Sequence, residues 1–118
     1  MHAYSDPVDG ARILDLFAGT GALGLEALSR GAKFACFVED AAEARGLIKE
    51  NIETLGVAGQ SKVFRRDATR MGSVHPNEPF SLIFCDPPYG KNLAPEALSS
   101  TLAGGWVTNN ALFVVEER

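Results

Sequence analysis

Five short apolar runs constrain the fold of this chain more than any other feature of its sequence. The runs lie at residues 13–17, 34–38, 63–64 with its flanks, 82–85 and 112–115. They are continuous rather than alternating, and β-branched and aromatic residues are frequent in them. Such runs are typical of strands that are buried on both faces of a parallel sheet. We therefore predict five strands of this kind.

The segments between the runs indicate helices at residues 22–30, 41–55 and 94–103. In the second helix, apolar residues recur at spacings of three and four, which predicts one buried face. The predicted face consists of Ala44, Leu47, Ile48, Ile52 and Leu55. Gly31 occupies the position of a left-handed helix cap, and the glycine and prolines of 68–79 indicate a loop. Alternating strands and helices predict an α/β fold with right-handed crossovers.

The composition is that of a soluble globular protein. The 118 residues suffice for one domain, with a flexible lead-in expected at 1–10 and a folded core at 11–118. No apolar stretch is long enough to span a membrane. Cys36 and Cys85 lie inside apolar runs and are interpreted as reduced core thiols. We expect a monomeric cytoplasmic protein without a metal site, because neither histidine has a partner at metal-ligand spacing.

Carboxylates occur at or near the carboxyl ends of the first four runs. They are Asp15, Glu39 with Asp40, Asp67 and Asp86. In a parallel sheet these ends meet at one edge, where open α/β sheets bind ligands. The alternative is that each carboxylate caps the helix that follows it, and this interpretation is favoured for Asp40.

A glycine-rich loop follows Asp15 and opens the first predicted helix. Its sequence is Gly19-Thr20-Gly21-Ala22-Leu23-Gly24, and Glu39 lies twenty residues after Gly19. This spacing indicates an adenosine-containing cofactor, with the carboxylate on the ribose hydroxyls. Two like charges 6 Å apart repel by roughly 3 kcal/mol at an effective dielectric constant near 20. The acidic edge therefore disfavours a dinucleotide pyrophosphate and favours S-adenosylmethionine, which carries a sulfonium and an ammonium group.

The sequence Asp86-Pro87-Pro88-Tyr89 follows the fourth run. Two consecutive prolines fix φ and donate no backbone hydrogen bonds, so the segment presents acceptors in a rigid shape. The Asp86 carboxylate and the Pro87 carbonyl could hold the two N–H bonds of an exocyclic amino group, while Tyr89 stacks on its base. The alternative is a strand-ending turn with a buried tyrosine.

The blocks at 15–32 and 86–89 resemble the RsmD-type methyltransferases, bacterial enzymes that methylate the guanine N2 amino group in 16S ribosomal RNA. The resemblance covers roughly residues 11–117. It implies a Rossmann-like fold with strand order 3-2-1-4-5, S-adenosylmethionine as cofactor, and ribosomal RNA or the small-subunit particle as substrate.

By this resemblance the glycine loop meets the methionine part of the cofactor, Glu39 the ribose, and Asp67 with Ala68 the adenine. The full expected cofactor set is Asp15, Phe17, Ala18, Gly19, Thr20, Gly21, Glu39, Asp40, Asp67, Ala68 and Asp86. The expected catalytic set, which holds the target base, is Asp86, Pro87, Pro88 and Tyr89.

The sequence departs from the family at both ends. It lacks the basic N-terminal segment and the final antiparallel strand pair, and its net charge is −4. We expect a truncated chain with weakened binding of RNA and cofactor, because nucleic-acid-binding surfaces are normally basic. Two alternatives stay open: N6-adenine methylation of DNA, and a non-catalytic fragment that binds the cofactor. Arg65, Arg66 and Arg70 are interpreted as a solvated loop, and Trp106 as a packing residue.

Overall fold

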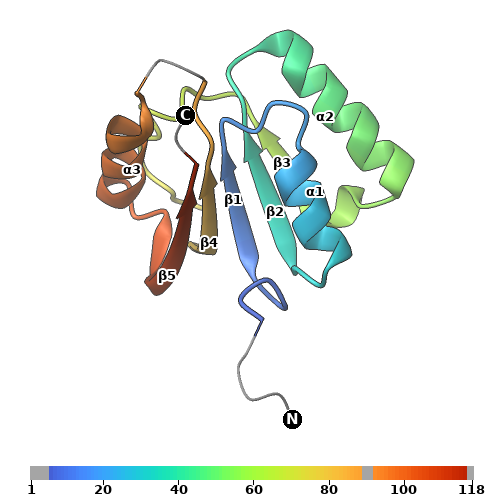
Figure 1. Cartoon of the computed structure of the whole chain (residues 1–118), viewed down its shortest axis with the longest axis horizontal. Coiled ribbons are helices and arrows are strands. Elements are labelled where there is room, and N and C mark those ends of the chain that lie inside the picture. The colour runs from blue at the N-terminus through green and yellow to red at the C-terminus, as the bar shows by residue number, and fades with distance from the viewer. Residues whose placement is uncertain (1–5, 89–91, 117–118) are drawn as a thin grey trace.

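A computed structural model describes residues 6–88 and 92–116 of the chain. Within these residues, five strands form one sheet in the order β3-β2-β1-β4-β5, and every neighbouring pair is parallel (Figure 1). The strands are β1 (Arg12–Leu16), β2 (Phe34–Val38), β3 (Ser61–Phe64), β4 (Phe80–Cys85) and β5 (Val107–Val115). The predicted parallel sheet and its strand order are confirmed. Strand β5 begins five residues before the predicted run, because Val107 pairs with Phe80 ahead of a register shift.

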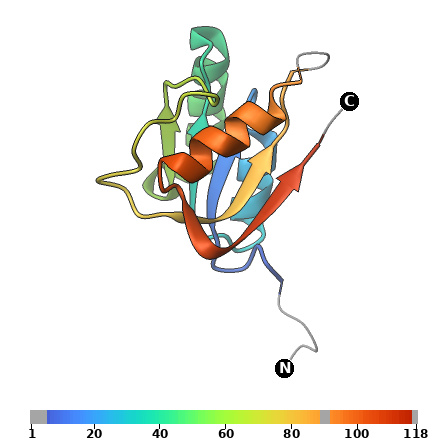
Figure 2. The same ribbon diagram turned by 90° about the vertical axis from the view of Figure 1, so that its left-hand side faces the viewer.

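Helices lie on both faces of the sheet. They are α1 (Ala22–Ser29), α2 (Ala42–Leu55) and α3 (Ala94–Ala103), with a single 3-10 turn η1 at Ala58–Gln60. Helices α1 and α2 cover one face, whereas α3 and the loop between β3 and β4 cover the other (Figure 2). The loop at 68–79 contains no helix, as predicted.

Each face of the sheet has its own core, and alternate residues of β1 contribute to each. Ile13 belongs to the cluster beneath α1 and α2, whereas Leu14 and Leu16 belong to the cluster beneath α3. In the second cluster the fully buried Trp106 stacks on Phe80, with ring centroids 6.1 Å apart. The indole nitrogen of Trp106 donates to the carbonyl of Gly72 at 2.8 Å. Trp106 is therefore a packing residue, as predicted.

Cys36 and Cys85 are both buried and are not joined in a disulfide, in agreement with the prediction. Burial raises the pKa of the Cys36 thiol to about 12. A thiol with so high a pKa holds its proton at neutral pH and is not a nucleophile.

Helix α2 buries a narrower face than its sequence pattern predicts. Ile48 and Ile52 are buried, but Leu47 and Leu55 are 46% and 59% exposed. The prediction is therefore wrong for these two leucines. Leu47 lies about 100° around the helix from the buried Ile48, and Leu55 is the last residue of α2.

Residues 6–10 form a turn that packs against the domain. Val8 is only 9% exposed and joins the core cluster beneath α1, and Gly10 N–H donates to the Gly31 carbonyl at 2.8 Å. Gly31 has φ +105°, the left-handed conformation expected after the first helix. The expected flexible lead-in therefore does not extend over residues 6–10, and residues 1–5 lie outside the described part of the chain.

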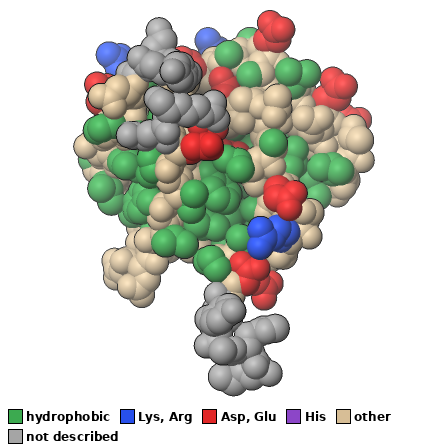
Figure 3. Space-filling view, in the orientation of Figure 1, with side chains coloured by type: hydrophobic (Ala, Val, Ile, Leu, Met, Phe, Trp, Pro, Cys, Tyr) green, Lys and Arg blue, Asp and Glu red, His purple; other side chains and the backbone are tan. Residues whose placement is uncertain are grey.

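The α1 side of β5 carries exposed apolar side chains. Leu112 and Val114 share this side and are 47% and 46% exposed, and hydrophobic atoms form a continuous area over β4 and β5 in Figure 3. No helix in the described residues covers this side of β5. No helix in the same residues is long and apolar enough to cross a lipid bilayer.

The two glycines inside helices provide a test of the packing between α1 and the sheet. A Cβ on Gly24 would collide with Phe37 Cε1 and lie 2.9 Å from its Cζ, whereas a Cβ on Gly46 in α2 would meet nothing within 4 Å. We expect Gly24→Ala to lower the free energy of unfolding by about 1–3 kcal/mol through overpacking. Gly46→Ala should raise it by about 1 kcal/mol through helix propensity. Urea denaturation measures both, and equal effects of the two substitutions would contradict this account of the packing.

Candidate functional site

The register of β1 places two carboxylates on either side of the loop that follows it. Asp15 lies opposite Phe37 in β2 and opposite Phe84 in β4. Glu39 and Asp86 each lie two residues beyond these partners, about 7 Å further along the strand direction. The parallel pairing thus brings both carboxylates to the carboxyl edge of the sheet, as predicted.

Asp15 itself lies below this edge, inside the domain. Its side chain shares the face of β1 with Ile13 and is 1% exposed, and its Oδ2 accepts a hydrogen bond from Gly24 N–H at 3.1 Å. Gly24 belongs to the first turn of α1, so Asp15 stabilises the start of the helix that follows it. Of the two interpretations of this carboxylate, helix capping describes what the structure shows.

Burial raises the pKa of Asp15 to about 7. The hydrogen bond from Gly24 lowers this pKa, while the negative charges of Asp86 and Glu39 raise it further. The three carboxylates therefore lie within electrostatic reach of one another, and they are not scattered over the molecule.

The glycine loop is held against the end of β2 by Glu39. Gly19 and Gly21 have φ values of +61° and +82°, a conformation that residues with a Cβ adopt at a cost. Glu39 Oε1 accepts from Gly19 N–H at 2.7 Å, and its Oε2 accepts from Ala41 N–H at 3.1 Å. One carboxylate thus ties the loop after β1 to the loop after β2.

A cavity of about 380 Å³ opens beside this carboxylate. Its lining residues are Phe17, Val38, Glu39, Asp40, Ala41, Arg66, Asp67, Ala68, Pro88 and Leu93. Five of the residues expected to bind the cofactor are among them, namely Phe17, Glu39, Asp40, Asp67 and Ala68. The volume lies within the range of about 300–1,000 Å³ that is usual for small-molecule sites.

The other expected cofactor residues do not line this cavity. They are Asp15, Ala18, Gly19, Thr20, Gly21 and Asp86. The glycine loop is nevertheless adjacent, because Gly19 N–H donates to the Glu39 carboxylate and Ala18 N–H donates to the Val38 carbonyl at 3.0 Å.

The charged residues of the lining are mainly acidic: Glu39, Asp40 and Asp67, with Arg66 as the basic residue among the described lining residues. The Arg66 guanidinium donates to the Met71 carbonyl and lies over the rings of Phe64 and Trp106, at 5.2 and 5.4 Å from their centroids. Hydrogen bonds from the side chain and backbone of Thr69 hold the pKa of Asp67 below its usual value, so Asp67 keeps its negative charge.

Sequence patterns did not indicate four of the residues that line this cavity, namely Val38, Ala41, Arg66 and Leu93. Arg66 was interpreted as part of a solvated loop, whereas it is half-buried and lines the cavity. Leu93 comes from the segment before α3, and Ala41 is the N-cap residue of α2. The position of Arg66 directly before Asp67 is the one sequence feature that could have indicated that it lines the cavity. No local sequence feature indicates Leu93 or Ala41 as lining residues.

Asp40 does not cap α2, contrary to the interpretation favoured from sequence. The N-cap residue is Ala41, and no side chain forms a capping hydrogen bond there. The Asp40 side chain is exposed on the cavity rim, while its carbonyl accepts from the Arg45 guanidinium at 2.7 Å. The helix begins at Ala42, one residue later than predicted, so its N-cap residue is Ala41.

The motif after β4 is described up to Pro88. Asp86 is half-buried, Pro87 is buried, and the exposed Pro88 contributes to the cavity wall. Tyr89, the fourth residue of the expected catalytic set, lies outside the described residues. Pro88 therefore connects this motif to the cavity that contains Glu39.

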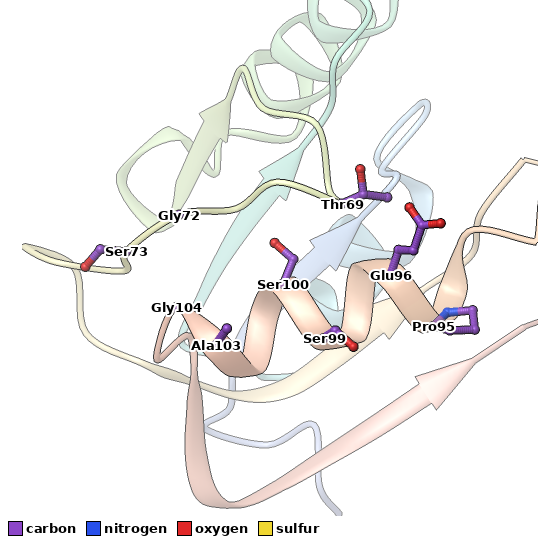
Figure 4. Close-up of a pocket in the computed structure, with 9 residues that line it drawn as sticks. All are labelled: Thr69, Gly72, Ser73, Pro95, Glu96, Ser99, Ser100, Ala103 and Gly104. Atoms are coloured by element: carbon purple, nitrogen blue, oxygen red, sulfur yellow. The ribbon is translucent and has the colours of Figure 1, made fainter.

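A second concave surface lies between α3 and the loop after β3 (Figure 4). This open groove of about 760 Å³ is lined by Thr69, Gly72, Ser73, Pro95, Glu96, Ser99, Ser100, Ala103 and Gly104. One of its hydroxyl groups, that of Ser100, accepts from Met71 N–H at 2.6 Å and joins the loop to α3. No residue of the predicted site lies in it. Over the described ranges, no group of three or more potential metal ligands occurs.

Comparison with known proteins shows the family to which the chain belongs. The family model described as Conserved hypothetical protein 95 matches residues 1–118. A curated relative, ribosomal RNA small subunit methyltransferase D of Haemophilus influenzae, is 39% identical over 105 residues, which is 87% of this chain and 54% of the relative. The chain thus spans about half the length of this relative.

Solved structures share the fold. A protein from Haemophilus influenzae titled "putative methylase" superposes with a TM-score of 0.83 at 36% identity, over 93% of this chain and 70% of that one. A methyltransferase from Thiobacillus denitrificans, solved with S-adenosyl-L-homocysteine, gives a TM-score of 0.70 at 22% identity, over 91% and 42% of the two chains. The second likeness supports the fold alone.

The buried Asp15 carboxyl group generates a prediction about pH. Its pKa of about 7 in the folded chain exceeds the value of 3.8 expected on unfolding, so folding is destabilised as the pH rises from about 4 to 7, and the loss levels off above this range. Such a shift corresponds to about 4 kcal/mol at its largest. Asp15→Asn keeps an acceptor for Gly24 N–H and removes the charge, so its gain in unfolding free energy should grow from near zero at pH 4 to several kcal/mol at pH 8.

Urea titrations of both proteins between pH 4 and 8 provide the measurement. Glu53→Gln removes an exposed carboxylate from α2, and the stability of this control should follow that of the unsubstituted chain. A constant difference in unfolding free energy between Asp15→Asn and the unsubstituted chain across this range would contradict the raised pKa of Asp15.

Proposed function

Because this chain belongs to the RsmD-type family, we propose that it forms the S-adenosylmethionine-binding core of a methyltransferase that acts on ribosomal RNA in the cytoplasm. The observation that carries this proposal is the acidic cavity beside the glycine loop, in which the Glu39 carboxylate faces the ligand space. The substrate would be 16S ribosomal RNA or the small-subunit particle, and the acceptor the exocyclic N2 amino group of a guanine.

The residues that line the cavity fit the proposed cofactor in charge. Glu39, Asp40 and Asp67 all contribute carboxylates to it, and Asp86 lies within electrostatic reach of Asp15 below it. A pyrophosphate would be repelled by these groups, whereas a ligand with sulfonium and ammonium charges would be attracted. The Gly19 and Ala41 amides occupy one acceptor site on each Glu39 oxygen. A carboxylate has about four such sites, which leaves room for two ribose hydroxyls.

The remaining lining residues suit a purine ring. Phe17, Val38 and Leu93 supply apolar surface, and Ala68 is buried behind them. We assign Asp67 with Ala68 to the adenine side and the glycine loop with Thr20 to the methionine side. Ala18, whose N–H is bonded to β2, is a structural member of this loop.

When bound, S-adenosylmethionine supplies a methyl group on a positively charged sulfur. The task of the chain is to hold an acceptor amino group next to it, and the Asp86 carboxylate and the Pro87 carbonyl are suited to this task. As hydrogen-bond acceptors, they would orient both N–H bonds and favour the pyramidal form of a nitrogen whose lone pair is otherwise delocalised. We assign Tyr89 to the face of the base. Catalysis would consist mainly of positioning and electrostatic stabilisation.

Binding of S-adenosylhomocysteine, measured by calorimetry, tests the first part of the proposal. The unsubstituted chain should bind it, and Glu39→Gln should bind about tenfold or more weakly, because hydrogen bonds to charged groups are each worth about 1.5–3 kcal/mol. Glu50→Gln, which removes an exposed carboxylate from α2, is the matched control and should bind as the unsubstituted chain does. Tighter binding of a nicotinamide dinucleotide would overturn the assignment of the cofactor.

Transfer of labelled methyl groups to small-subunit RNA and particles tests the second part. Asp86→Ala should retain binding of S-adenosylhomocysteine and lose turnover by about 100-fold or more, by analogy with the removal of one transition-state contact. Asp86→Asn keeps one acceptor oxygen and should lose less. Mass analysis of the modified nucleoside should give N2-methylguanosine. Finding N6-methyladenine in DNA instead would identify DNA as the substrate. Binding of the cofactor without any methyl transfer would identify a cofactor-binding fragment.

A further inference from the structure

The loops after β1 and β2, which both contribute to the cofactor cavity, are attached to side chains of α2. The Arg45 guanidinium donates from Nη1 to the Asp40 carbonyl at 2.7 Å and to the Glu39 carbonyl at 3.3 Å. Six residues further along the helix, Asn51 Nδ2 donates to the Thr20 carbonyl at 3.1 Å. Neither Arg45 nor Asn51 lines the cavity.

Ile48 lies between these two residues on α2 and fixes the helix against the glycine loop. It is fully buried, and a Cβ on Gly21 would lie 3.3 Å from its Cγ2. Residues three apart on a helix are neighbours on its surface. Arg45, Ile48 and Asn51 therefore form one row along α2 that contacts both loops.

The contacts made by this row determine where the Glu39 carboxylate can lie. Arg45 fixes the main chain of Glu39 and Asp40, and Asn51 fixes the loop whose Gly19 N–H donates to Glu39 Oε1. If either loop moved, the carboxylate could not accept from Gly19 and from Ala41 at the same time.

From this arrangement we propose that Arg45 and Asn51 are positioning residues for the cofactor, which hold Glu39 in its ribose-binding orientation from behind the cavity. The inference rests on the proposed function, since it concerns the same site. It predicts the direction in which ligand affinity changes when Arg45 is replaced. If only the charge of Arg45 mattered, its removal would strengthen the binding of a cationic ligand, whereas removal of a positioning residue weakens the binding of S-adenosylmethionine and S-adenosylhomocysteine alike.

Calorimetry with both ligands tests the proposal. Arg45→Met should bind each about tenfold more weakly, since two charge-assisted hydrogen bonds are lost, and Asn51→Ala about threefold, since one neutral hydrogen bond is lost. Arg45→Lys should recover part of the affinity. Lys49→Met makes the same charge change at an exposed position of the same helix, so this control should bind as the unsubstituted chain does.

A double-substitution cycle separates positioning through Glu39 from a general loss of structure. In a Glu39→Gln background, Arg45→Met should weaken binding by much less than tenfold, because the group that Arg45 positions has already been altered. In the ligand-free protein, hydrogen exchange of the Gly19 and Ala41 amides should accelerate in Arg45→Met, while amides in the centre of β1 keep their protection.

The outcomes distinguish this inference from the function on which it rests. If the unsubstituted chain fails to bind S-adenosylhomocysteine, the proposed function and this inference both fall. If it binds and Arg45→Met binds equally well, or binds S-adenosylmethionine more tightly, only the positioning role is overturned. Full additivity with Glu39→Gln would likewise overturn it.

Discussion

The parallel pairing of β1 with both of its neighbours is the constraint on which the candidate site depends. Because the three strands run in one direction, their carboxyl ends coincide, and residues distant in sequence lie at one edge. Glu39 and Asp86 lie on opposite sides of the loop after β1 because of this parallel pairing. An antiparallel pairing on either side would carry one of them to the far end of the sheet.

At this edge a single carboxylate connects the parts of the site. Glu39 accepts hydrogen bonds from the loops after β1 and β2, and α2 fixes both loops from behind through Arg45 and Asn51. The cavity wall is therefore built before any ligand arrives. Preorganisation of this kind lowers the entropic cost of binding, because the loops need no further ordering.

Several negative charges close together repel one another, and the fold limits this repulsion. Asp15 lies beneath Glu39 and Asp86, and because its pKa is raised to about 7, it is only partly ionised near neutral pH. In the function proposed above, the charges of Glu39 and Asp86 would favour a cationic ligand. The raised pKa of Asp15 results mainly from its burial, to which the charges of Asp86 and Glu39 add.

The sequence by itself determined the order of elements, the parallel sheet and the residues of the glycine loop. These follow from local chemistry, since continuous apolar runs need burial on both faces and a backbone with positive φ favours glycine at Gly19 and Gly21. Tertiary structure decided which side chains meet. Asp15 turns inward because its strand face packs against α1, where it accepts from Gly24 N–H, and Arg66 reaches the cavity through its contacts with Phe64 and Trp106. Both outcomes depend on neighbours that are more distant in the chain, which the local sequence does not identify.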